Sequence, residues 1–206
     1  MIGIRVTGDM RVVGEPDEDD GIITWLYCMI YEVIESDDDD EGEKEVEIGR
    51  ADVAIIHVGQ ADNHGVSLVD ALDAESGELE ALYWVYFDKE GNYKDRFVAG
   101  GGRDLLYISD VRIEERYRER NVDLAIVRQL SRSFGGGCEL VVVPYESEPD
   151  AKRWSMLGFV VSTEGEPTGF MHHQQAFVAP RVVETDESGR FKVVPNLTPD
   201  EIEKVN

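Results

Sequence analysis

The sequence has few cysteines, few basic side chains and no long apolar run. Its two cysteines, Cys28 and Cys138, lie far apart inside apolar stretches. One pair does not build the disulfide framework of a small secreted protein, so both are predicted to be buried thiols. No segment reaches the roughly 18 apolar residues of a membrane-spanning helix, and residues 1–6 lack the features of a signal peptide. These absences predict a cytoplasmic protein that does not enter membranes.

Basic side chains are outnumbered, because 20 Lys and Arg stand against 44 Asp and Glu and give a formal charge of -24. Such a surface repels nucleic-acid phosphates and anionic lipids over about a Debye length, roughly 8 Å at physiological salt. Direct binding of nucleic acids through bulk charge is therefore excluded. The 206 residues are 42% apolar, which is enough for one domain with a real core.

The charge is uneven along the chain. Residues 1–100 hold 26 acidic and 7 basic side chains, many of the acids in runs at 15–20 and 35–47. We interpret these runs as solvated loops; the alternatives are adaptation to a salty cytoplasm, attraction of cationic substrates or a basic protein partner. Residues 101–132 hold seven arginines and six acids. An anionic ligand is therefore expected in this region.

The first half reads as a β-hairpin followed by helices. Residues 22–34 and 46–58 are rich in β-branched and aromatic side chains, which predicts two strands joined by an acidic loop, with residues 2–13 as an edge strand. Residues 66–87 predict one broken helix or two short ones, capped by Ser67 and interrupted near 76–77. We expect the aromatic side chains of these segments to line the core or a groove: Trp25, Tyr27, Tyr31, Tyr83, Trp84 and Tyr86.

The second half alternates strands and helices. We expect strand 104–113, helix 122–134, strand 138–144, helix 148–158 and strands 159–161 and 170–178. Short links between such elements imply parallel pairing with right-handed crossovers. The predicted fold class is therefore α+β, with an α/β-type mixed sheet flanked by helices. A hairpin around 186–189 and a short helix after Pro199 complete the chain.

One strand-helix junction resembles a known superfamily. The strand 105–113 runs into Tyr117-Arg118-Glu119-Arg120-Asn121-Val122-Asp123, and a later helix ends in Leu157-Gly158-Phe159. Over about residues 104–178 this pattern resembles the GNAT superfamily of acyl-CoA-dependent N-acetyltransferases. The resemblance implies a GNAT-like domain at 1–180, with an N-terminal part at 1–100 and an acyl-CoA-binding half at 101–180. Residues 181–206 are then a C-terminal extension.

The resemblance implies that acetyl-CoA, or another acyl-CoA, binds at the junction. A helix N-terminus offers unpaired N–H groups and partial positive charge to a diphosphate, and the preceding strand holds the pantetheine arm. The implied cofactor-binding residues are Val111, Ile113, Arg118, Arg120, Asn121, Val122 and Asp123.

The junction also departs from the family pattern. Asn121 replaces the first glycine, and asparagine tolerates left-handed backbone angles. Asp123 replaces a glycine or alanine, and its carboxylate about 6 Å from a phosphate charge costs on the order of 3 kcal/mol before screening. It can instead cap the helix itself. Arg118 and Arg120 are expected to offset part of this cost.

Candidate proton-transfer groups lie near the same junction. Trp154 stands where many family members have a tyrosine acid, and an indole N–H does not serve as an acid near neutral pH. Tyr145 is the candidate substitute, and Asp110 is the candidate base, with a surface or salt-bridged role as its alternative. Strand alternation predicts that His172 and His173 point one inward and one outward. We predict no metal site.

Three functions follow from these patterns. The first is an N-acyltransferase that moves an acyl group from acyl-CoA to an amine, with a small-molecule or peptide amine of cationic character favoured by the acidic surroundings. The second is a GNAT-fold binding or interaction protein without catalysis, suggested by Asn121, Asp123 and Trp154. The third is an acidic mimic that occupies a basic partner protein.

Overall fold

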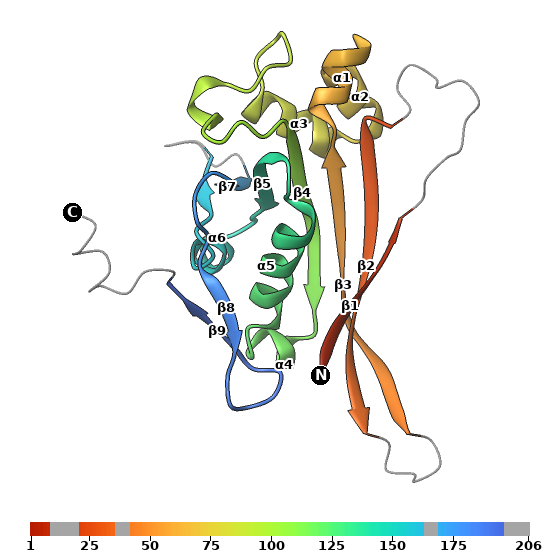
Figure 1. Cartoon of the computed structure of the whole chain (residues 1–206), viewed down its shortest axis with the longest axis vertical. Coiled ribbons are helices and arrows are strands. Elements are labelled where there is room, and N and C mark those ends of the chain that lie inside the picture. The colour runs from red at the N-terminus through yellow and green to blue at the C-terminus, as the bar shows by residue number, and fades with distance from the viewer. Residues whose placement is uncertain (9–20, 36–41, 163–168, 196–206) are drawn as a thin grey trace, which may run out of the picture.

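The computed structural model describes residues 1–8, 21–35, 42–162 and 169–195. A seven-stranded mixed sheet in the order β1-β2-β3-β4-β5-β7-β6 forms its centre. Only β4 and β5 pair in parallel, and every other neighbouring pair is antiparallel. Helices flank this sheet (Figure 1), so the predicted α+β class with a mixed sheet is confirmed. The strands are β1 (Ile2–Gly8), β2 (Ile23–Glu35), β3 (Glu43–Ile56), β4 (Asp104–Ile113), β5 (Cys138–Pro144), β6 (Val160–Val161) and β7 (Phe170–Gln174).

The N-terminal half forms the predicted hairpin. β2 and β3 pair from Ile23–Ile56 to Glu35–Glu43, and β1 pairs with the outer side of β2 as the edge strand. β1 covers Ile2–Gly8 of the predicted strand, and the rest of that prediction, residues 9–13, lies outside the described residues. The acidic run at 15–20 and the centre of the second run lie outside the described residues.

Short helices gather at one end of the sheet (Figure 1). They are α1 (Val58–His64), α2 (Leu68–Glu75), α3 (Gly77–Tyr86) and the 3-10 turn η1 (Asp95–Phe97). The predicted interruption falls at Ser76, whose hydroxyl accepts a hydrogen bond from the Leu79 N–H at 3.2 Å and so caps α3. α1 was not predicted, because the apolar run of β3 continues to Val58 and hides the start of that helix.

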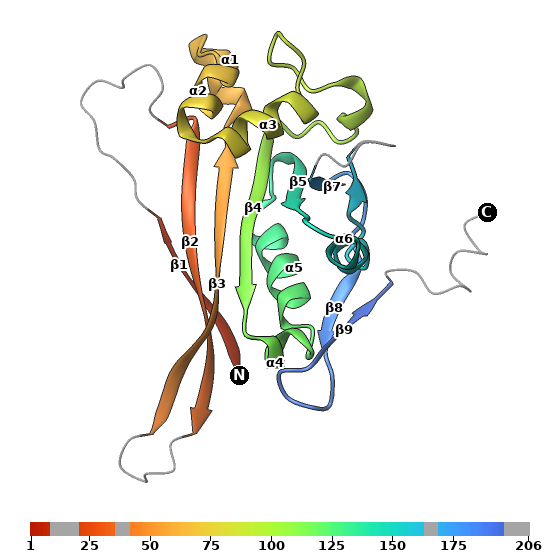
Figure 2. The ribbon, with the colours of Figure 1, turned by 180° about the vertical axis from the view of Figure 1, so that it is seen from behind.

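The C-terminal half places a long helix against the sheet and a hairpin beside that helix (Figures 1 and 2). The helices are α4 (Glu115–Arg118), α5 (Val122–Phe134) and α6 (Glu148–Ser155), and the hairpin strands are β8 (Arg181–Glu184) and β9 (Phe191–Val194). The hairpin around 186–189 is therefore confirmed, whereas the helix expected after Pro199 lies outside the described residues.

The prediction of parallel pairing throughout this half is wrong. β7 lies between β5 and β6 and runs antiparallel to both. Crossing through α6 makes β6 run in the same direction as β5 but does not require the two strands to be neighbours. The following strand, β7, takes the place beside β5.

Both faces of the sheet are covered. Leu106 and Ile108 of β4 belong to an apolar cluster with α5, whereas Leu105 and Tyr107 belong to a second cluster with α2 and α3. All but the last residue of β5 are buried, as its continuous apolar run predicts. No described helix is both long and apolar enough to cross a membrane.

The predicted burial of the thiols is confirmed, and that of the aromatic side chains only in part. Both cysteines are free and buried, and desolvation raises the pKa of Cys28 to about 11 and of Cys138 to about 12. Tyr83 and Tyr86 are buried, but Tyr27 is 48% exposed and Trp84 is 52% exposed. Trp84 lies on the outer side of α3, where its indole N–H donates to Glu80 at 3.2 Å.

Candidate functional site

β4 and β5 stop pairing halfway along β4. Their parallel register runs from Asp104–Cys138 to Tyr107–Val142, after which β4 pairs only with β3 and β5 only with β7. The β3 register passes from Asp52–Asp110 to Val53–Ile108, so Ser109 is an extra residue that bends β4. Beyond Tyr107, the β5 side of β4 has no strand partner among the described residues. An extended ligand with amide groups can bond such an edge.

The bend in β4 leads to the start of α5. Asn121 precedes α5 with φ 60° and ψ 29°, which is the left-handed conformation that asparagine tolerates. Within the described parts of the chain, no acceptor contacts the main-chain N–H groups of Val122, Asp123 and Leu124. These three donors lie at the positive end of the helix dipole.

Asp123 does not cap the helix as one alternative predicted, because its carboxylate forms a buried ion pair instead. The side chain is 3% exposed, and both its oxygens accept hydrogen bonds from the Arg153 guanidinium. Arg118 Nε lies 3.7 Å from Asp123 Oδ2 and Arg118 Nη2 donates to Asp150 at 2.8 Å. Asp123 is therefore neutralised by two guanidinium groups.

The β8–β9 hairpin holds the other side of the α4–α5 junction. Phe191 N–H donates to Arg120 O at 2.8 Å, and the Asn121 side-chain amide donates to Phe191 O at 2.7 Å. Arg120 itself donates to Gly189 O at 3.0 Å and lies 3.6 Å from Glu32. Of the two arginines expected to offset the charge of Asp123, Arg118 therefore lies beside this carboxylate, whereas Arg120 is bound by the hairpin.

The candidate proton-transfer residues lie on β4 and just after β5. The Asp110 carboxylate is 37% exposed and pairs with Arg112 Nε at 2.7 Å, so its salt-bridged alternative is observed. Tyr145 is partly buried against the α5 cluster, and its main-chain N–H donates to Gly169 O at 2.8 Å. No hydrogen bond joins Asp110 to Tyr145 among the residues described. Val111 and Ile113 also pack partly against that cluster.

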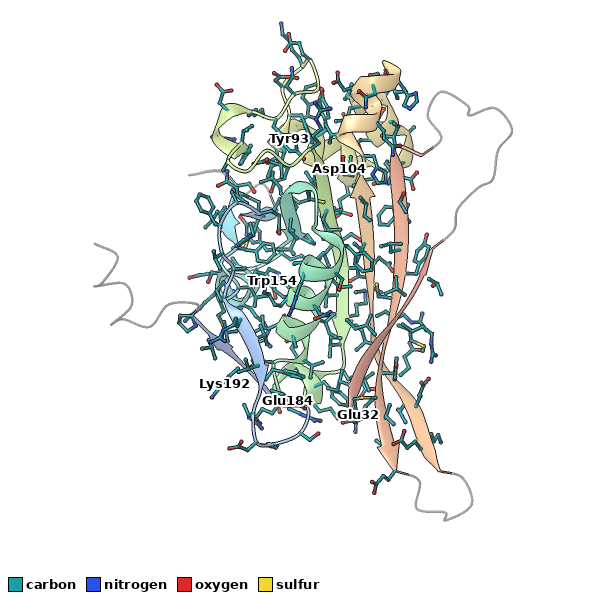
Figure 3. All side chains as sticks on the ribbon, viewed as in Figure 1. Glu32, Tyr93, Asp104, Trp154, Glu184 and Lys192 are labelled. Atoms are coloured by element: carbon teal, nitrogen blue, oxygen red, sulfur yellow. The ribbon has the colours of Figure 1, made fainter. Side chains whose placement is uncertain are left out.

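Trp154 occupies the same end of β5 as Tyr145. Its indole is buried, with 8% of the residue exposed, and the N–H donates to Pro144 O at 3.2 Å. The Trp154 side chain is therefore held by a carbonyl group at the end of β5, in the middle of the molecule (Figure 3).

The histidine prediction is half wrong. His172 and His173 lie on opposite faces of β7, yet each is only 8% exposed because side chains cover both faces of the sheet there. Desolvation, followed by the charges of His173 and Arg96, lowers the pKa of His172 to about 4. His57 lies between Asp104, at 3.2 Å, and Thr24, at 3.0 Å. In the part of the chain that the structure describes, no three metal-ligating side chains come together.

Two large cavities lie away from these residues. One, of about 620 Å³, is bounded by β1, α5 and the β8–β9 hairpin, and we call it the α5 groove. The other, of about 560 Å³, lies at the end of the molecule with the short helices and is lined by Tyr93 and Arg103. Tyr93 and Asp104 mark this end in Figure 3, and Glu32 and Lys192 the opposite end. Neither cavity is lined by Asp110 or Tyr145.

Two features of the junction have no signal in the sequence. Arg153 lies 30 residues from Asp123, and Lys152-Arg153 has the ordinary pattern of a solvated helix face. The hairpin contacts join residues about 70 positions apart in the sequence and use mainly main-chain groups. Main-chain contacts do not require particular residue types, so the sequence does not reveal them.

A scan of the sequence against protein-family models matches none of them, and a comparison with curated proteins finds no relative.

Proposed function

We propose that the protein is a GNAT-like N-acyltransferase that transfers an acyl group from acyl-CoA to a cationic amine. The observation that carries the proposal is the parting of β4 from β5 after Tyr107, next to a helix start with three unpaired N–H groups. A pantetheine arm has amide groups that match the open side of β4, and a diphosphate matches the helix start.

The charge at the helix start supports diphosphate binding better than the sequence alone suggested. The electrostatic cost of placing a phosphate near Asp123 applies to an unpaired carboxylate, whereas Arg153 and Arg118 neutralise this one. A diphosphate that approaches Val122, Asp123 and Leu124 therefore meets a locally balanced site. In this proposal Asp110 removes the amine proton and Tyr145 returns a proton to the thiolate, while aligned binding supplies much of the rate.

The second candidate is a GNAT-like binding protein without catalysis. A specific observation favours it: Trp154 is buried and its N–H is used by Pro144 O, so this position supplies no acid. The hairpin bonds to Arg120 and Asn121 also engage side chains that the resemblance assigns to the cofactor.

Titration calorimetry with acetyl-CoA and CoA separates the two candidates. For an acyltransferase we expect binding at sub-millimolar cofactor, and about tenfold tighter binding for Asp123→Asn, because Arg153 is then free to contact the diphosphate. Asp62→Asn, the same substitution in α1 at the other end of the molecule, is the matched control and should leave the affinity unchanged. If millimolar acetyl-CoA does not bind, the acyltransferase proposal is wrong.

A turnover assay tests the catalytic step. Release of CoA thiol from acetyl-CoA in the presence of a polyamine should occur with the wild-type protein. It should fall at least tenfold in Asp110→Asn while the affinity for CoA persists, because the carboxylate acts only on the amine. Binding without turnover for a polyamine, an aminoglycoside and a lysine peptide would favour the second candidate.

A further inference from the structure

The α5 groove has apolar walls from three separate parts of the chain. Its volume of about 620 Å³ falls within the range of small-molecule sites. The apolar side chains that line it include Ile2 and Ile4 of β1, Leu130 and Phe134 of α5, and Val182 and Phe191 of the hairpin. The groove is separate from the parted end of β4, because no residue of β4 lines it.

Three arginines line the groove without a counter-ion among the described residues. Arg128 and Arg132 of α5 and Arg181 of β8 form no ion pair with any described residue. Elsewhere in the chain, exposed arginines such as Arg5 and Arg116 pair with carboxylates, whereas Arg96 and Arg103 also form no ion pair with described residues. The groove differs in bringing three such arginines to one cavity.

The arginines are also close enough to repel one another. Arg128 and Arg132 lie four residues apart on α5, and like charges at this spacing destabilise a helix. Burial, and then the charge of Arg132, lowers the pKa of Arg128. An anion placed between these groups reduces their repulsion and supplies a charge partner.

The groove has an apolar end and a cationic end. At the apolar end, the main-chain N–H of Phe191 donates to Arg120 O just before the start of α5. Gly189 of the hairpin turn lies beside the Ile2 side chain. The hairpin turn thus closes the groove against β1. Arg181 pairs with Val194 at the far end of the hairpin, and Arg132 lies in the last turn of α5. Arg132 and Arg181 therefore lie away from the closed end.

We propose that the α5 groove binds a single-chain carboxylate amphiphile, that is, a medium- or long-chain fatty acid. Its alkyl chain lies along Leu130 and Val182 toward Phe191, and its carboxylate meets the guanidinium groups at the open end. Arginine suits this head group, because its planar fork donates two parallel hydrogen bonds to a carboxylate. Since one end is closed, the groove accepts one chain from one direction.

Titration calorimetry of the full chain tests the ligand class. Decanoate and laurate should bind, with affinity rising up to about fourfold for each added methylene. Dodecanol and dodecylammonium have chains of the same length without the negative charge, and each should bind at least tenfold more weakly than laurate. Equal affinity for laurate and dodecylammonium would overturn the proposal, as would the absence of laurate binding.

Variants test the location. Arg132→Gln combined with Arg181→Gln should weaken laurate binding at least tenfold, because both charged hydrogen bonds to the carboxylate are removed. Both positions are exposed, so the substitutions should leave the fold intact. Arg5→Gln is the matched control. Arg5 lies on β1, which lines the groove, but its side chain pairs with Glu45 and stacks on Tyr31, outside the groove. Unchanged laurate binding in the double variant means adventitious apolar binding and refutes the proposal.

A tail-end variant gives a second, independent readout. Ala125 lines the groove on α5 and is partly exposed, so Ala125→Phe should shorten the space for the alkyl chain. We expect laurate to lose its advantage over decanoate while decanoate still binds. Circular dichroism confirms that the variant is folded, and a chain-length dependence like that of the wild type contradicts the assigned direction. Asp123→Asn should leave laurate binding unchanged, which separates this site from the acyl-CoA site.

Discussion

The buried ion pair between α5 and α6 makes an asymmetric prediction about stability. Asp123 is 3% exposed and accepts two hydrogen bonds from Arg153, which is itself 21% exposed. Replacing Arg153 by methionine leaves a buried carboxylate, and breaking a buried pair in this way typically costs about 3–5 kcal/mol. Arg118 remains 3.7 Å from Asp123, so we expect about 3 kcal/mol.

Removing the other partner should cost much less. In Asp123→Asn the Arg153 guanidinium reaches water and keeps its hydrogen bonds to Arg118 O, at 2.8 Å, and Asn121 Oδ1, at 3.3 Å. We expect a loss of about 1 kcal/mol, as for an ordinary hydrogen bond. Combining both substitutions should be less harmful than Arg153→Met alone, because no charge is then buried.

Urea unfolding of the three variants measures these differences. The midpoint should shift while the slope of the free energy of unfolding against urea stays constant. Lys152→Met, at an exposed neighbour on α6, is the control and should change stability by less than about 0.5 kcal/mol. Equal losses for Arg153→Met and Asp123→Asn, or a larger loss for Asp123→Asn, would refute the assignment of Asp123 as the buried partner.

Two further predictions concern buried titratable groups. Desolvation lowers the pKa of His172 from 6.5 to about 4, so the unfolded chain binds the proton more tightly than the folded protein does. The contribution of neutral His172 to the free energy of unfolding is therefore complete above pH 6.5. It is lost, by up to about 3 kcal/mol, as the pH falls toward 4. His172→Gln should flatten this part of the stability profile, and an unchanged slope would contradict it. Because burial raises the pKa of Cys28 and Cys138, neither thiol should react with a thiol reagent in the native protein at pH 8, and both should react after unfolding.

Local sequence patterns predict most of the elements of this fold. Strands and helices of the second half are bounded by strong signals, such as Ser147, whose hydroxyl accepts from Asp150 N–H at 3.3 Å at the start of α6. The hairpin of β2 and β3 follows from its β-branched composition. Strand order is harder to predict, because the choice of β7 rather than β6 beside β5 depends on packing between residues distant in sequence.

The candidate site is predictable to the extent that it consists of consecutive residues. Asn121 combines a residue type that accepts left-handed angles with a position before an apolar helical repeat, and the structure has it at φ 60°. The role of Asp123 does not follow from its position, because a carboxylate at a helix start can cap the helix, repel an anion or pair with a cation. Its role follows from Arg153, which the fold brings in from α6.

Charge distribution links the two proposed ligands to the architecture. The helix start is neutral because Asp123 and Asp150 are matched by Arg118 and Arg153, so a diphosphate there must rely on main-chain N–H groups and the helix dipole. The open end of the α5 groove has guanidinium groups that form no ion pair with described residues, so a ligand there must bring its own charge. Since salt screens exposed charges more than main-chain hydrogen bonds, raising the ionic strength should weaken laurate binding more steeply than CoA binding. Under the two proposals, the same helix therefore binds one kind of anion at its first turn and the other near its last.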